Sequence, residues 1–112
     1  MATVEECREA LKELADRMAA NAAEINGRLS LDRPIAVTLD DLGVSFHGRF
    51  VDGQIRDLTD GDDPRAKMRL TTTSDDLLAM VSGQLDFFKT WMSGRLKVSA
   101  SPFDLIKLRK LM

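Results

Sequence analysis

The chain has 112 residues, enough for one domain with a hydrophobic core and too few for two ordinary domains. Hydrophobic residues make up 44% and charged residues 30%, which is typical of a globular protein. The formal net charge of -2 removes the overall attraction to phosphates that nucleic-acid-binding proteins use. We therefore expect a single domain over residues 1–112 and no nucleic-acid partner.

The cysteine content and the N-terminal segment favour a cytoplasmic location. A single cysteine, Cys7, cannot form an intramolecular disulfide, which fits a reducing compartment. The first 18 residues are charged every few positions and hold neither the apolar run of a signal peptide nor a membrane span.

The segment Thr3 to Asn26 has the periodicity of one long amphipathic helix. Its apolar residues recur at three- and four-residue spacing: Val4, Cys7, Leu11, Leu14, Met18, Ala22 and Ile25. Thr3 and Glu6 fit a capping box at the start. Asn26-Gly27 fits a left-handed stop at the end.

After Pro34 the apolar period changes to two, which is typical of β-strands. Residues 35–39 and 44–50 both alternate in this way. The segment 40–43, Asp-Asp-Leu-Gly, lies between them and has the composition of a turn. The pattern predicts a β-hairpin.

Two further strands follow in the same half of the chain. Asp52-Gly53 predicts a tight turn into a third strand over residues 54–58, whose uneven phase indicates a bulge or an early end. The acidic turn 60–64 leads into residues 66–71, which alternate again and predict a fourth strand. We expect this sheet to be mostly antiparallel.

Helical signals dominate the next segment. Thr73 followed by Asp76 predicts the start of a second helix, and Gly83 predicts its end. Residues 86–93 fit a short third helix that stops at Gly94.

The chain closes with a predicted strand and a predicted helix. Residues 95–100 alternate as a fifth strand. Ser101, Pro102 and Asp104 then provide a cap, a first helical residue and a carboxylate near the free amides of a last helix. The order of elements predicts an α+β domain with helices gathered over a sheet.

The sequence contains no catalytic, metal or cofactor constellation. The only histidine, His47, lies in a predicted strand without a nucleophile motif, and Cys7 lies on an apolar helix stripe. The acidic segment 57–63 lacks the order of an EF-hand loop, and the glycines form no phosphate-binding motif. We expect no enzymatic activity, no metal and no cofactor.

Most of the aromatic surface lies in "DFFKTWMSGRLKVSASPF", residues 86–103. Two interpretations of this apolar excess stay open. Its residues form an ordinary core, or they line a binding cavity.

The segment "TTTSDDLLAMVSGQLDFFKTWMSGRLKVSA", residues 71–100, resembles the signature of the sterol carrier protein 2 (SCP-2) family. The shared features are an Asp-rich helix start, a Leu-x-x-Met-x-Ser-Gly-x-Leu segment and an aromatic-Met-x-Gly-(Lys/Arg)-Leu-Lys-(Ile/Val) turn and strand. The upstream helix, hairpins and fourth strand follow the family layout less tightly, so the resemblance covers roughly the whole chain.

This resemblance implies a five-stranded, mostly antiparallel sheet covered on one face by helices. It also implies an apolar tunnel between the sheet and the C-terminal helices, which holds a sterol, a fatty acid or an acyl-CoA without transforming it. The lipid-contacting residues that it implies are Val81, Ser82, Leu85, Phe88, Trp91, Met92, Leu96, Val98, Phe103 and Ile106. Aromatic and thioether side chains suit such a tunnel because they provide large, adaptable apolar surface.

Alternatives to a lipid carrier remain at this stage. The chain is instead a structural or partner-binding module with a self-filled core, or an accessory subunit that presents lipids to a metabolic enzyme. An enzyme is the weakest alternative. Lys107, Arg109 and Lys110 either touch an anionic membrane during lipid exchange or simply stabilise a solvated helix end. The sequence does not predict an oligomeric state.

Overall fold

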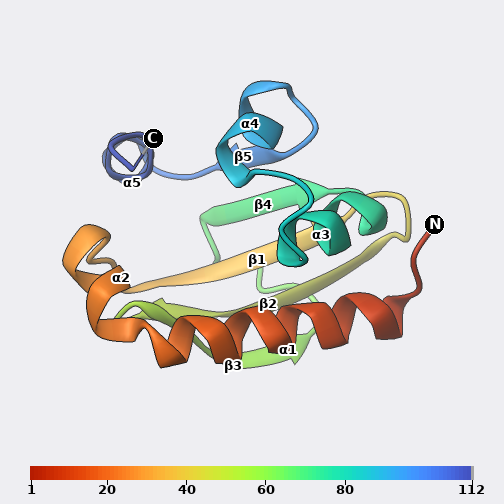
Figure 1. The fold of residues 1–112 in the computed structure, drawn as a ribbon, viewed down its shortest axis with the longest axis horizontal. Coiled ribbons are helices and arrows are strands. Elements are labelled where there is room, and N and C mark those ends of the chain that lie inside the picture. The colour runs from red at the N-terminus through yellow and green to blue at the C-terminus, as the bar shows by residue number, and fades with distance from the viewer. Residues whose placement is uncertain (112) are drawn as a thin grey trace.

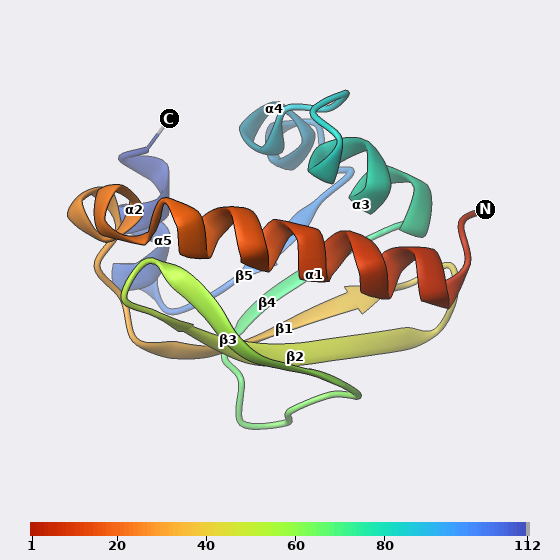
Figure 2. The same ribbon diagram turned by 60° about the horizontal axis from the view of Figure 1, so that its bottom comes forward.

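A five-stranded sheet with helices over one face forms the framework of the computed structural model, which describes residues 1–111 (Figure 1). The elements are α1 (Val4–Ala20), α2 (Ala22–Arg28), β1 (Arg33–Leu39), β2 (Val44–Val51), β3 (Gln54–Asp60), β4 (Met68–Thr72), α3 (Ser74–Val81), α4 (Phe87–Met92), β5 (Lys97–Ser99) and α5 (Pro102–Arg109). Figure 2 shows α1, α3 and α4 on the same side of the strands. The predicted α+β class is confirmed.

The strand order is β3-β2-β1-β4-β5, so the first three strands form a meander and the fourth returns to the side of β1. The β1–β4 pair is parallel, and the other three pairs are antiparallel. The predicted irregularity of the third strand is confirmed by a shift in the β2–β3 register between His47 and Arg49. The sheet is therefore mostly antiparallel, as predicted.

The turn between β2 and β3 positions the start of α2. Asp52 and Gly53 both have positive φ values, 54° and 77°, as a two-residue hairpin turn requires. A Cβ atom added to Gly53 would lie 2.1 Å from the carbonyl oxygen of Ala22. Glycine is needed here because the turn backbone packs directly against the first residue of α2.

The prediction of one helix from Thr3 to Asn26 is wrong at its C-terminal part. The capping box of Thr3 and Glu6 is confirmed, but Asn21 breaks the helix with φ -120° and ψ 22°. The Asn21 side chain donates a hydrogen bond to the carbonyl of Arg17, a local bond that competes with the helical backbone pattern. The predicted stop at Asn26-Gly27 lies within α2 instead.

The predicted helix starts in the second half are confirmed. Thr73, Asp86 and Ser101 each accept a hydrogen bond from the backbone amide three residues later, which caps α3, α4 and α5. Gly83 and Gly94 have positive φ values just beyond the ends of α3 and α4. The fifth strand is shorter than predicted, since β5 covers only Lys97–Ser99.

The apolar core consists of two clusters at opposite ends of the sheet. The N-terminal cluster lies between α1, α3 and the strands, and its buried members are Ala2, Cys7, Ala10, Leu11, Val37, Leu39, Phe46, Leu77 and Val81. The second, which we call the C-terminal cluster, has the buried members Leu29, Leu31, Ile35, Phe50, Met68 and Leu108. Within residues 1–111, none of the helices combines the length and apolar character needed to cross a bilayer.

Candidate functional site

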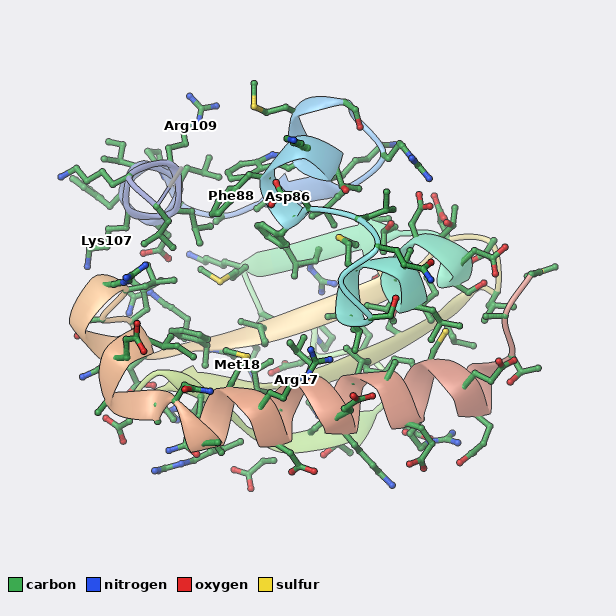
Figure 3. The ribbon with its side chains drawn as sticks, viewed as in Figure 1. Arg17, Met18, Asp86, Phe88, Lys107 and Arg109 are labelled. Atoms are coloured by element: carbon green, nitrogen blue, oxygen red, sulfur yellow. The ribbon has the colours of Figure 1, made fainter. Side chains whose placement is uncertain are left out.

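The C-terminal cluster lies in the region where the resemblance implies a lipid. It joins residues of the sheet and α2 to β5 and α5, and it is bordered by the half-buried side chains of Met18, Ile25, Ile55, Trp91, Val98, Ala100 and Leu111. Figure 3 shows Met18 extending from α1 towards the sheet and Phe88 extending from α4 on the side of α5. The cluster is therefore apolar on all of its contributing elements and includes two flexible thioether side chains.

Arg17 and Met18 mark the border between the two clusters. Met18 packs on the C-terminal cluster, whereas the Nη2 atom of Arg17 donates a 2.5 Å hydrogen bond to the carbonyl of Val81 at the end of α3. Both side chains are labelled in Figure 3. Arg17 therefore contacts α3, and the next residue of α1, Met18, already packs on the C-terminal cluster.

The ten predicted contact residues are distributed over both clusters and the surface. Trp91 and Val98 pack on the C-terminal cluster, while Val81 is buried in the N-terminal one. Leu96 is 2% exposed, and Leu85 and Phe88 are half-buried. The structure thus brings only part of the predicted set together.

Four of the predicted residues lie on the outer surface. Met92, Phe103 and Ile106 are 76%, 78% and 53% exposed. Ser82 is also exposed, and its hydroxyl donates to the carbonyl of Ala79. A role for these four side chains in lipid contact stays a prediction.

The aromatic residues of α4 form one packed group. The Phe87 ring meets Phe88 edge-on at a centroid distance of 5.2 Å and Trp91 at 6.3 Å. Asp86 holds the helix start, since its carboxylate accepts from the amide of Lys89 and its carbonyl accepts from the hydroxyl of Thr90. Phe87 is absent from the predicted set, although its position next to Phe88 was a usable signal.

Most of the C-terminal cluster comes from the first half of the chain and was missed by the sequence prediction. Ile25, Leu29, Phe50 and Ile55 show the ordinary periodicity of helix and strand residues. Nothing in that periodicity says which end of the sheet a residue will face. The fold brings these residues to α5, about 50 to 80 positions away along the chain.

A buried carboxylate lies at the edge of the C-terminal cluster. Asp104 is 4% exposed, and its Oδ2 atom accepts a 3.2 Å hydrogen bond from Nε of Arg33. Its Oδ1 atom is buried and has no hydrogen-bond partner among the described residues. Leu108, one helical turn later, belongs to the C-terminal cluster. A ligand hydroxyl or a water molecule would satisfy this acceptor, whose isolation is otherwise costly.

Of three hollows on the surface, one adjoins the C-terminal cluster at Leu31 and Arg33. A groove of about 890 Å³ between α1 and α3 is lined by acidic residues, including Glu5, Glu9 and Glu13. Two smaller hollows, of about 230 and 410 Å³, lie beside Arg33 and beside Phe46. None of the three is the apolar tunnel that the resemblance implies, so that tunnel stays a prediction.

The single cysteine and the single histidine have structural environments. Cys7 is fully buried, and burial, followed by the nearby charge of Asp41, raises the pKa of its thiol. The Nδ1 atom of His47 lies 2.9 Å from the carbonyl oxygen of Gly61, which ties β2 to the turn after β3. Residues 1–111 contain no group of acidic, histidine or cysteine side chains arranged to hold a metal ion.

The sequence comparison identifies the family. The model of the SCP-2 sterol transfer family matches residues 5–112. The chain belongs to the SCP-2 sterol transfer family. The resemblance carried by residues 71–100 is thereby confirmed. Domains of this family are generally non-catalytic and bind lipids. Among curated proteins, no relative matches the sequence.

Solved structures show the same fold in proteins of different size. Sterol carrier protein 2 from Aedes aegypti in complex with palmitate has a TM-score of 0.59 at 15% identity, over 99% of this SCP-2 chain and 96% of that one. The ubiquinone synthesis protein UbiJ-SCP2 has a TM-score of 0.59 at 14% identity, and the alignment covers 96% of this chain and 89% of that one. The sec-alkylsulfatase Pisa1 from Pseudomonas sp. has a TM-score of 0.60 at 20% identity, over 82% of this chain.

The present chain spans only 14% of the alkylsulfatase chain. The similarity to that larger enzyme is therefore limited to the SCP-2 domain and includes none of the rest of it.

Proposed function

We propose that this SCP-2 domain binds one lipid, a sterol, a fatty acid or an acyl-CoA, between the sheet and the C-terminal helices and transfers it unchanged in the cytoplasm. The C-terminal cluster is the observation that supports this proposal. It is apolar on each contributing element, is bordered by Met18 and Trp91, and has the unpartnered carboxylate oxygen of Asp104 at its edge.

Burial of the lipid chain supplies the binding free energy. Each methylene removed from water contributes about 0.8 kcal/mol, so ten of them contribute about 8 kcal/mol before ordering costs. Apolar contacts select ligands by length and shape only loosely, because few polar groups take part. We expect a range of lipids to bind, with the Arg33–Asp104 pair as the main polar selector.

Mass spectrometry of the protein purified without detergent tests the proposal. A carried lipid appears as additional mass in native spectra that is lost on denaturation. Bare protein in all native spectra, also after addition of palmitate or cholesterol, would contradict lipid binding. It would favour the alternative of a partner-binding module with a self-filled core.

The variant Trp91→Ala separates the two alternatives. If Trp91 borders a lipid site, its loss weakens palmitate binding roughly tenfold and lowers the free energy of unfolding by only about 1 to 2 kcal/mol. If it fills a closed core, the free energy of unfolding falls by about 3 to 5 kcal/mol.

Leu14→Ala is the matched control for this variant, because Leu14 is also half-buried but packs on the N-terminal cluster. The control should leave palmitate affinity unchanged. Fluorescence displacement measures the affinity, and urea titration followed by circular dichroism measures the stability.

A further inference from the structure

The outward side of α5 combines exposed apolar and cationic residues. Asp104 and Leu108 face the body of the molecule and are 4% and 8% exposed. The opposite side of the helix carries four exposed residues at positions i, i+3, i+4 and i+7, namely Phe103, Ile106, Lys107 and Lys110. We call these four residues the docking face.

The apolar members of the docking face are unusually open. Phe103 exposes more than three quarters of its surface, and Ile106 exposes more than half. Met92 of α4 is also exposed by more than three quarters. Among residues 1–111, Met1 is the only other large apolar residue that is exposed. Figure 1 shows α4 and α5 near the β5 edge of the sheet, whereas α1 lies near β3 at the other edge. Exposed apolar side chains of this kind indicate a contact surface.

Positive charge is concentrated in the C-terminal segment that contains α4 and α5. Residues 87–112 contain six Lys and Arg but one Asp, a formal charge of +5, whereas residues 1–86 contain ten Lys and Arg against 17 Asp and Glu, a formal charge of -7. The single Asp, Asp104, is buried and pairs with Arg33. Figure 3 shows Arg109 extending away from the molecule and Lys107 extending towards α2, where its Nζ atom lies 3.5 Å from the carbonyl oxygen of Ser30. Arg95 pairs with Asp76 of α3, so the remaining cations of this segment are the ones complementary to an anionic partner.

We propose that the docking face binds the surface of an anionic lipid bilayer, a proposal that rests on the lipid-transfer function above. Phe103 and Ile106 would enter the boundary between headgroups and acyl chains. Lys107 and Lys110 would remain at the level of the lipid phosphates, since their long side chains reach from an apolar stripe to a polar layer.

A second copy of the chain fits this surface less well. A symmetric dimer would place the same cationic residues of two copies against each other, which is unfavourable. The acidic groove between α1 and α3 would be repelled by anionic lipids, so only one end of the molecule suits the bilayer. Docking through α5 would also place the helix that covers the C-terminal cluster at the membrane.

Vesicle co-sedimentation tests the proposal with the full chain. Wild-type protein should bind vesicles of phosphatidylserine and phosphatidylcholine, should bind pure phosphatidylcholine vesicles far less, and should dissociate at high salt. Lys107→Glu with Lys110→Glu should weaken binding to the anionic vesicles by roughly tenfold or more. The double variant Phe103→Ser with Ile106→Ser should also weaken binding to the anionic vesicles. The size of this loss should depend less on the salt concentration than the loss caused by the lysine substitutions.

Arg65→Glu with Lys67→Glu is the control, because it makes the same change in net charge at exposed residues of the loop before β4. Equal loss of binding in the control would overturn the docking face. So would failure of the wild type to bind anionic vesicles. A dimer that Phe103→Ser dissociates would assign the face to a second copy instead.

Native mass spectra of the same variants separate this proposal from the proposed function. Docking variants that keep their lipid but no longer bind vesicles would support both proposals. A wild type that binds vesicles but never carries a lipid would contradict the proposed function alone. Circular dichroism confirms that each variant is folded.

Discussion

At the scale of single residues, the pair of Arg33 and Asp104 is the most informative polar contact of the site. The Asp104 side chain is buried, and Arg33 supplies the hydrogen bond that its Oδ2 atom accepts. Arg33 is about half exposed, so the same guanidinium remains in contact with solvent. The pair carries charge to the edge of the C-terminal cluster without placing a cation inside it.

The variant Arg33→Met should destabilise the protein. It leaves the buried carboxylate without its cationic donor, which costs about 1 to 3 kcal/mol. The control Arg28→Met removes a cation whose partner, Glu24, is exposed, and surface pairs of this kind contribute about 0 to 1 kcal/mol. Urea unfolding at neutral pH measures both. Equal effects of the two substitutions would show that the Asp104 carboxylate does not depend on Arg33.

At the scale of elements, the contact of the β2–β3 turn with α2 explains where the first helix breaks. The turn backbone at Gly53 approaches the carbonyl of Ala22 so closely that no side chain fits between them. Local sequence predicts a continuous helix through Asn21, because the apolar stripe continues to Ile25. The break satisfies a contact with residues about 30 positions later in the chain.

Gly53→Ala should therefore be more disruptive than Gly43→Ala. Both glycines have positive φ values, 77° and 66°, so both substitutions carry the conformational cost of about 1 to 2 kcal/mol. Only at Gly53 would the new Cβ atom also overlap backbone atoms, which adds about 1 to 3 kcal/mol. Thermal unfolding of the two variants measures the difference. Similar losses would contradict a close contact between the turn and α2.

The elements that the sequence predicted well are those with local causes. Capping by Thr3, Thr73, Asp86 and Ser101 depends on residues within one helical turn, and these starts are confirmed. The parallel pairing of β1 with β4 has no local cause, and the residue pattern did not predict it. Sheet order depends on long-range packing, which periodicity does not encode.

The candidate site was predictable only in part for the same reason. Trp91 and Val98 pack on the C-terminal cluster, but the apolar residues of α5 occur all round a short helix. Their spacing does not show which side faces the core. The structure turns Leu108 inwards and leaves Phe103 and Ile106 outside.

At the scale of the whole molecule, hydrogen-bonded aspartates join segments that are distant in sequence. Arg8 on α1 binds Asp60 at the end of β3, Arg49 binds Asp32, and Asp41 accepts two hydrogen bonds from Ser74. These bonds lower the pKa values of Asp32, Asp41 and Asp60 below the ordinary value of 3.8. In each case the first cause is the side-chain hydrogen bond.

These shifts predict a loss of stability in acid. Because the carboxylates bind protons more weakly when folded than when unfolded, their contribution is complete above the ordinary pKa. It is lost as the pH falls through the lower folded-state values. The urea midpoint should be constant from about pH 7 to about pH 5 and should decrease below about pH 4.

Arg8→Gln is the variant that checks this origin, because it removes the main cause of the shift at Asp60 and should flatten part of the acid decrease. A midpoint that rises towards acid pH would contradict the assignment.

The position of β5 at the edge of the sheet has a consequence for the order in which parts of the molecule open. β5 pairs with β4 through only three residues, while β1 and β2 share seven paired positions. Short edge strands unfold locally at a lower free energy than long central ones. Transient opening of β5 together with α5 would expose the C-terminal cluster while the meander stays folded. A lipid would then enter and leave through β5 and α5, the part of the fold that opens most easily. No separate hinge would be needed to open the site.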